Sequence, residues 1–292
     1  MDNTKHLNGG GWWQCYQHCY IRKDYEMPLD SEPSFSQIEK EYKSIHGDEK
    51  RHAFFAQYIT EFDVNEPTEW WFTVKDSEYD LSKLQSKKRY EITKAHKFCI
   101  AKKINGYDYK KELFDCYVKA FDAYPEKYRL RSFDYEAFKK SIKLWDENQN
   151  MHIYAVFFIE TNLLVGFLLV EQKNRFIKLV MQKTDPAYEK YNSNAALVDC
   201  MCNDWNEKIK TGEAVITNGS RSIKHQTNFN AYLEKYFGFR KAYAKLKIVY
   251  RFPFGIVVFL LKPFMKLFEK TGNPFLYNIY CVLKMDSCAY RN

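Results

Sequence analysis

One stretch decides the fold prediction: Asn218–Tyr243, which reads NGSRSIKHQTNFNAYLEKYFGFRKAY. It contains a turn, a polar loop, a helical pattern and an exit through Gly238 and Phe239. The apolar residues at helical spacing are Phe229, Tyr232, Leu233 and Tyr236. Glycine commonly follows the last turn of a helix, so Gly238 predicts a helix end. A loop rich in Arg, His, Gln and Asn therefore opens directly onto a helix, and the question is whether this loop binds a ligand or only connects two elements.

The residues around this stretch predict strands and helices in a regular order. Short turns at Thr161-Asn162 and Lys173-Asn174 join three apolar runs, which is typical of an antiparallel meander, and Gly166 inside the second run predicts a bulge. In chain order the predicted elements are a strand at 98–104, helices at 109–124 and 133–148, strands at 152–160, 163–172 and 175–184, a helix at 195–210, a strand at 213–220, a helix at 227–237 and a strand at 239–252. The helix between the fourth and fifth strands permits parallel pairing there. We therefore predict an α/β fold with a mixed, mostly antiparallel sheet flanked by helices.

This order of elements resembles the acyl-CoA N-acyltransferase fold of the GNAT superfamily. YLEKYFGF, residues 232–239, is similar to the superfamily's late helix, which commonly ends in Gly-Phe before the last strand. WWFTVKDSEYDLSKLQSKKRYEITKAHK, residues 70–97, resembles the lead-in of Fem-type and related cell-envelope acyltransferases. The resemblance covers 70–250 and implies three parts: a partial companion domain at 1–97, a GNAT-like acyltransferase domain at 98–250 and an apolar tail at 251–292.

The resemblance implies an acyl donor, acetyl-CoA or another acyl-CoA, at the start of the helix that follows the fourth strand. GNAT enzymes usually hold the donor's pyrophosphate there on a Gly-rich loop, because the free N–H groups of a helix start favour anions. The matching stretch here, YEKYNSNAAL at 188–197, has no glycine, and we expect Asn192, Ser193 and Asn194 to cap and line the helix start instead. Fem-type relatives often lack the glycine loop and take an aminoacyl group from tRNA, so the donor stays open between these two classes.

The resemblance also places the polar loop at a cleft where the fourth and fifth strands part. His225 is our first candidate for the general base, since the ordinary pKa of histidine suits proton transfer near neutral pH. Glu171, at the end of a strand, is a second candidate and has the alternative of a surface carboxylate. The candidate substrate-binding residues of the loop are Arg221, Gln226 and Asn228. The alternative for the whole loop is helix capping by Thr227 with solvated neighbours.

A basic segment, 80–97, precedes the predicted acyltransferase domain. Its apolar residues at helical spacing are Leu81, Leu84, Ile92 and Ala95, and its lysines near the opposite face are Lys83, Lys87, Lys94 and Lys97. Lys88 lies within the apolar stripe, so we add Lys88 and Arg89 to the candidate substrate-binding residues. A solvated basic face is the alternative. The net charge of +8 suits anionic lipid, nucleic acid or a phosphorylated substrate without choosing among them, and no DNA partner is expected.

The segment Arg251–Lys270, RFPFGIVVFLLKPFMKLFEK, combines an apolar run with lysines. Its uninterrupted run 252–261 is too short to span a bilayer and ends at Lys262-Pro263. Lysines alternating with apolar residues favour a helix in the plane of an anionic membrane surface. A buried helix packed on the N-terminal region is the alternative.

The eight cysteines lack the spacing of a disulfide framework, and the N-terminus lacks the apolar core of a signal peptide, so we expect a cytoplasmic protein, peripheral at the inner membrane face. The predicted function is transfer of an acyl or aminoacyl group to an amine or hydroxyl of a cell-envelope polysaccharide or lipid-linked sugar precursor. No metal is implied. The alternatives are a catalytically inactive, membrane-peripheral binding protein and a tRNA-dependent aminoacyl transferase.

Overall fold

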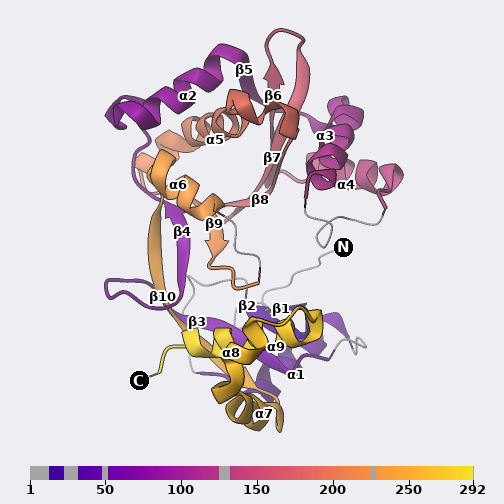
Figure 1. Cartoon of the computed structure of the whole chain (residues 1–292), viewed down its shortest axis with the longest axis vertical. Helices are drawn as coiled ribbons and strands as arrows, with labels where there is room; N and C mark the ends of the chain where they lie inside the picture. Colours follow the sequence, from indigo (N-terminus) through magenta and orange to yellow (C-terminus); the bar gives the residue numbers. More distant parts are fainter. Residues whose placement is uncertain (1–12, 23–31, 48–51, 125–131, 225–227, 292) are drawn as a thin grey trace. The chain divides into compact units, whose positions relative to one another are not determined.

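The computed structural model describes residues 13–22, 32–47, 52–124, 132–224 and 228–291. They form two compact units, and Figure 1 labels their elements along the chain. Unit 1 comprises the described residues of 1–72, 220–227 and 241–292, and unit 2 comprises those of 73–219 and 228–240. These bounds differ from the predicted ranges, since the helix before residue 98 packs in unit 2 and most of the last strand packs in unit 1.

Unit 2 is built on the predicted mixed sheet. Its strands are β5 (Cys99–Ile104), β6 (Met151–Phe158), β7 (Leu163–Lys173), β8 (Phe176–Thr184) and β9 (Val215–Ser220). Neighbours pair antiparallel from β5 to β8, whereas β8 and β9 pair parallel. The predicted fold class, the meander and the parallel pair are therefore confirmed.

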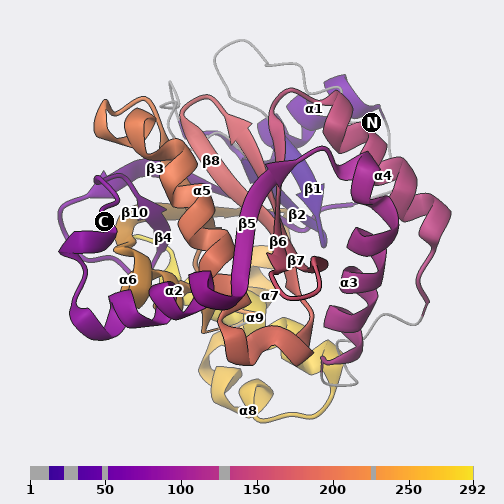
Figure 2. The same ribbon diagram turned by 90° about the horizontal axis from the view of Figure 1, so that it is seen from above.

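Helices cover both faces of this sheet (Figure 2). The helices α2 (Ser86–Phe98), α5 (Ser193–Lys210) and α6 (Phe229–Phe237) pack on one face, and α3 (Lys110–Asp122) and α4 (Tyr135–Glu147) pack on the other. α5 follows the predicted helical stripe, with Val198, Met201 and Trp205 buried. α6 ends as predicted at Gly238, whose left-handed φ of 68° suits a residue without Cβ.

The basic segment is not one helix from residue 80. A short 3-10 helix, Leu81–Lys83, comes first, and α2 begins only at Ser86. Asp80 caps the short helix through Ser82 N–H, and Lys83 pairs with Glu78 at 2.6 Å. The helical pattern predicted over 80–97 is therefore wrong as one helix, because Lys83 belongs to a separate turn that already carries its own counter-ion.

The sheet strands of unit 1 are β1 (Trp13–Tyr16), β2 (Cys19–Arg22), β3 (Phe55–Val64) and β10 (Arg240–Tyr250), which are neighbours in this order. β2 and β3 pair parallel, whereas β1–β2 and β3–β10 pair antiparallel. α1 (Phe35–His46) starts with a capping box at Ser34 and Gln37 and buries Ile38 against this sheet. β4 (Trp71–Lys75) leads from unit 1 into unit 2.

The apolar C-terminal segment forms short helices within unit 1. They are α7 (Phe254–Leu261), the 3-10 helix Lys262–Phe264, α8 (Met265–Glu269) and α9 (Pro274–Cys288). Asp286 of α9 joins them to the sheet, since it accepts hydrogen bonds from Tyr250 of β10 (2.7 Å), Lys262 (2.5 Å) and Arg291 (2.6 Å). Among the helices of the described residues, none is both long and apolar enough to cross a membrane.

Candidate functional site

The strands β8 and β9 part soon after they meet. Their pairing comprises three pairs, from Phe176↔Val215 to Lys178↔Thr217. Beyond the last pair, the register of β8 with β7 shifts, because Val170 faces Leu179 and Leu169 faces Met181. Val180 is thus the extra residue of a bulge, and a bulge bends its strand locally. The predicted divergence of the fourth and fifth strands is confirmed, and the bulge at Val180 accounts for it.

From Thr217, where its pairing with β8 ends, β9 forms hydrogen bonds with β4 and α6 instead. Thr217 donates a hydrogen bond from its hydroxyl to the Thr73 carbonyl of β4 at 3.1 Å. The amide of Asn218 donates to the Asn230 side chain of α6 at 2.6 Å. The part of β8 after the bulge therefore lies outside the pairing with β9.

The start of α5 lies beside this part of β8. The Asn194 side-chain oxygen accepts hydrogen bonds from Gln182 (2.7 Å) and Thr184 (3.3 Å), both of β8. Asn192 has a left-handed φ of 58°, so it makes the turn that a glycine commonly makes, and its amide donates to the carboxylate of Glu91 at 2.7 Å. Asn192 and Asn194 lie at the helix start, but the predicted capping is wrong for Asn192, whose side chain makes no cap bond, and both side chains are engaged by other residues.

Two buried polar atoms at this place have no hydrogen-bond partner among the described residues. They are the Ser193 hydroxyl oxygen, in a side chain that is fully buried, and the side-chain oxygen of Gln182. A buried polar group without a partner is costly, so such atoms are often found where a ligand supplies the missing bond. The N–H groups of Ala195 and Ala196 donate to the Asn192 carbonyl, so only the N–H groups of Ser193 and Asn194 at the start of α5 are left for a ligand. These groups fit the polar part of an acyl donor, with Ser193 and Gln182 as the residues that would hold it.

The surroundings are less suited to a full pyrophosphate. Among the described residues, one cation forms an ion pair with the β8–α5 connection: Lys119 binds Asp185 at 2.8 Å. The rings of Phe158, Tyr188 and Tyr191 pack together on the same connection, with centroids 4.8 to 6.2 Å apart. Lys190, within the connection, is exposed, lies 5.0 Å from the Tyr191 ring and forms no ion pair with a described residue. It is therefore a free positive charge beside the helix start, but a pyrophosphate carries more than one negative charge.

A polar network that the sequence did not reveal joins α2 to α5. The carboxylate of Asp199, buried on α5, accepts a hydrogen bond from the Tyr79 hydroxyl (2.5 Å) and bonds the Nε2 atom of His96 (2.9 Å). The bond to Asp199 raises the pKa of His96 despite partial burial, and burial together with Asp199 raises the pKa of Tyr79. Lys75 is also buried in this unit, which lowers its pKa, and it donates to Ser77 and the Glu78 carbonyl. No pattern in the sequence predicts these long-range contacts.

The other predicted site residues are found in different settings. Arg221 belongs to unit 1, donates to the carboxylate of Glu69 at 3.0 Å and lies 4.5 Å from the Trp71 ring. Asn228 is exposed at the start of α6 in unit 2, and His225 and Gln226 lie outside the described residues.

Lys88 is half-buried on α2, whereas exposed Arg89 donates to the Ser82 carbonyl at 3.0 Å. Glu171 is half-buried on β7 and faces Lys178 across the β7–β8 ladder, next to the last pair that β8 makes with β9. Of the predicted set, the structure thus brings together Asn192, Ser193 and Asn194, and it adds Gln182 and Thr184.

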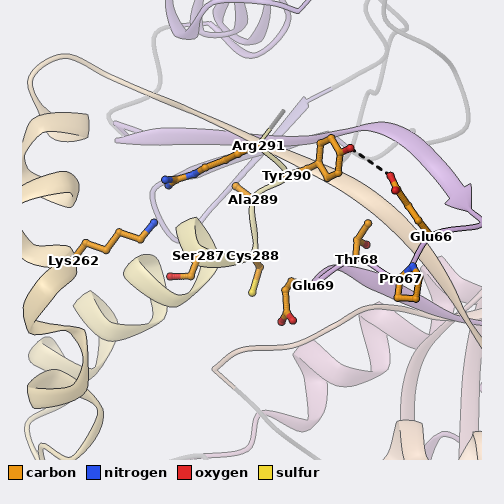
Figure 3. Close-up of a pocket in the computed structure, with 10 residues that line it drawn as sticks. All are labelled: Glu66, Pro67, Thr68, Glu69, Lys262, Ser287, Cys288, Ala289, Tyr290 and Arg291. Atoms are coloured by element: carbon orange, nitrogen blue, oxygen red, sulfur yellow. Dashed lines mark hydrogen bonds between the residues drawn. The ribbon is translucent and has the colours of Figure 1, made fainter.

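Unit 1 contains a pocket of about 510 Å³ (Figure 3). Glu66, Glu69, Lys262 and Arg291 line it, together with Cys288 and Tyr290 of the chain's end. Its charges are largely neutralised within the protein, since Lys262 and Arg291 bind Asp286, and Glu69 binds Arg221. None of the predicted site residues that the structure describes lines this pocket, and its charge pattern indicates no particular ligand.

Comparison with known proteins gives relatives of low similarity. No family model matches the chain, and no curated protein matches it. Solved structures similar to it include L-PGS from Bacillus licheniformis, with 14% identity over 93% of this chain and 84% of that one and a TM-score of 0.45. FemX is similar with 7% identity over 75% of this chain and 77% of that one, at a TM-score of 0.47.

A third similar structure is the C-terminal domain of a candidate lysylphosphatidylglycerol synthetase from Agrobacterium fabrum. Its identity is 9% over 85% of this chain and 82% of that one, at a TM-score of 0.48. GNAT acetyltransferases are found as well, over shorter parts of the chain. Fem-type and GNAT proteins, the groups that the sequence resembles, are thus both among the solved structures to which this chain is similar.

Proposed function

We propose that the protein is an acyl or aminoacyl transferase that acts where β8 leaves β9. The observation that carries this proposal is the three-pair contact of β8 with β9, followed by the bulge at Val180. It leaves an open strand edge beside the start of an 18-residue helix with a buried, unpartnered Ser193 hydroxyl. A strand edge and a helix start together offer preorganised N–H groups for a carbonyl that gains negative charge.

The chain's own groups then have distinct roles. Ser193, Gln182 and the N–H groups at the start of α5 bind the donor, and N–H groups of β8 beyond the bulge stabilise the oxyanion. The nitrogen or oxygen of the acceptor attacks the acyl carbon, its proton passes to a base, and the donor's thiol or tRNA hydroxyl leaves. An acyl-CoA or aminoacyl-tRNA, when bound, supplies the activated acyl bond.

His225 is the proposed base, with Glu171 as the second candidate. Replacing a general base commonly costs roughly a hundredfold in rate or more, so His225→Ala should lower kcat/KM by about that factor. Glu171→Gln is the matched comparison. A hundredfold loss in Glu171→Gln and an unchanged rate in His225→Ala would exchange the two assignments.

The proposed acceptor is an amine or hydroxyl of a lipid-linked sugar or polysaccharide precursor, with the enzyme at the cytoplasmic face of the inner membrane. The donor remains open between acyl-CoA and aminoacyl-tRNA, and the hydrogen-bonding character of the helix start suits either. Mass spectrometry of any ligand that copurifies with the protein would identify the class directly.

The test supplies labelled acetyl-CoA and, separately, tRNA charged with labelled amino acids, each with a cell-envelope lipid extract as acceptor. Movement of label from one of the two donors into the extract is the expected result. If either donor binds but no label moves, the alternative of an inactive binding protein replaces the transferase. If neither binds, the site assignment itself is wrong.

A further inference from the structure

The C-terminal helices expose apolar side chains more densely than any other described part of the chain. Of the 19 large apolar residues that are exposed among the described residues, eight fall within 252–275. Five of them are more than 60% exposed: Phe252, Phe259, Leu260, Leu267 and Phe275. Exposed apolar side chains are common singly, but such a concentration marks an interaction surface.

α7 uses only one stripe to attach to unit 1. The ring of Phe254 stacks on that of Phe54 with centroids 5.2 Å apart, and Val258, one turn later, is 4% exposed. Residues at this spacing lie on one helix face. Ile256 and Val257, which lie between these two residues, and Phe259 and Leu260, which follow Val258, are exposed. Because Phe254 and Val258 hold α7 against the rest of unit 1, the exposed side chains do not contribute to the packing of the helix.

Positive charge accompanies this surface. Residues 252–275 contain Lys262, Lys266 and Lys270 against a single carboxylate, Glu269. Lys262 is neutralised by Asp286, whereas Lys266 and Lys270 are exposed and form no ion pair with any described residue. Exposed lysines beside aromatic and aliphatic side chains are typical of protein surfaces that rest on anionic lipid.

We infer that the exposed residues of 252–275 form a docking surface for an anionic lipid bilayer. The phenylalanine and leucine side chains enter the headgroup and acyl boundary, while Lys266 and Lys270 meet lipid phosphates. This surface differs from the predicted one in that Val258 faces the protein and is an anchor of the helix. The inference does not depend on the proposed transferase reaction, since docking requires neither donor nor acceptor.

The test is sedimentation with phosphatidylcholine vesicles, with and without phosphatidylglycerol, in the absence of any donor. Wild type should bind the phosphatidylglycerol vesicles, and Phe259→Ser with Leu260→Ser should lose more than tenfold in affinity. The matched control, Leu144→Ser with Ile100→Ser, removes equally exposed apolar residues of unit 2 and should bind as wild type does. Lys266→Ala with Lys270→Ala should weaken binding roughly fivefold per lysine, and only to anionic vesicles.

Three results would overturn the inference: no binding by wild type, equal loss in the control variant, or a dimer of wild type that ignores vesicles and is disrupted by Phe259→Ser with Leu260→Ser. The last result would assign the surface to a second copy of the chain. A second pair, Leu267→Ser with Phe275→Ser, lies on α8 and α9 and repeats the test if the first pair fails to fold. Normal transferase activity in a variant that no longer binds vesicles would separate docking from catalysis.

Discussion

The helices α5 and α7 are both rich in apolar residues, yet the structure uses them in opposite ways. α5 buries ten of its 18 residues, and its apolar stripe covers the sheet of unit 2. α7 consists of eight residues without a single charge and buries only Val258. Apolar content alone therefore does not identify a core helix. The number of side chains that a helix buries against its own domain determines how many apolar side chains stay exposed.

The largest expected difference between the two helices is in how much an alanine substitution lowers the free energy of unfolding. Met201 of α5 is fully buried, so Met201→Ala should lower the free energy of unfolding by about 2–5 kcal/mol. Leu260 of α7 is 61% exposed, so Leu260→Ala should change it by less than about 0.5 kcal/mol. Urea denaturation followed by circular dichroism measures both. Similar losses in the two variants would show that α7 is covered by protein and would remove the contrast.

A smaller effect tests what α5 does besides packing. The Ser193 hydroxyl has no described partner, so Ser193→Ala removes no known hydrogen bond and should leave the unfolding midpoint unchanged. A lost hydrogen bond to the donor should nevertheless lower kcat/KM by roughly tenfold. Ser141→Ala is the control, since Ser141 bonds the Ala137 carbonyl on α4, away from the proposed site. A drop in stability without a drop in activity would make Ser193 a structural residue.

The smallest expected effect is the pH dependence of stability from two polar contacts, His96 with Asp199 of α5 and Asp286 with its three partners near α7. The pKa of His96 is raised by its bond to Asp199, so this contact contributes stability below the unfolded pKa of about 6.5 and loses it as pH rises through the folded pKa. Burial acts to raise the pKa of Asp286, but Lys262, Tyr250 and Arg291 together hold it below its ordinary value. That contact contributes stability above the unfolded pKa of about 3.9 and loses it as pH falls through the folded pKa.

The variants His96→Asn and Asp286→Asn separate these two dependences. His96→Asn should remove only the loss of stability on raising the pH from about 6 to 8, and Asp286→Asn should remove only part of the loss in acid. Thermal unfolding from about pH 2 to about pH 8 measures both. An unchanged slope in His96→Asn would mean that the half-exposed histidine is screened by solvent and contributes nothing measurable.

Most of the sheet could be predicted because its signals are local. Apolar runs, short turns and Gly238 determine β5 to β9, α5 and α6 within a few residues of their observed bounds. Gly166 is another such signal. β7 shifts register against β6 there, and a Cβ on this residue would lie 2.6 Å from the Thr184 side chain.

The candidate site was only partly predictable. The sequence placed Asn192, Ser193 and Asn194 at a helix start because the helical pattern is local, whereas the capping expected of Asn192 does not form. The bulge at Val180 has no glycine to mark it, and the bonds of Gln182 and Thr184 to Asn194 arise only when β8 and α5 are brought together. The exposure of α7 also depends on tertiary contacts, which explains why the sequence favoured a helix on a membrane surface but left a buried helix as the alternative.

The most direct test of the proposed site is amide hydrogen exchange with and without donor, run in parallel with acetyl-CoA and with aminoacyl-tRNA. If the reaction takes place where β8 leaves β9, one of the two donors should slow exchange in peptides that cover 179–196, the end of β8 and the start of α5. The residues of α7 should exchange at the same rate with either donor. Protection that appears only outside 179–196, or no protection with both donors, would contradict the assignment of the site.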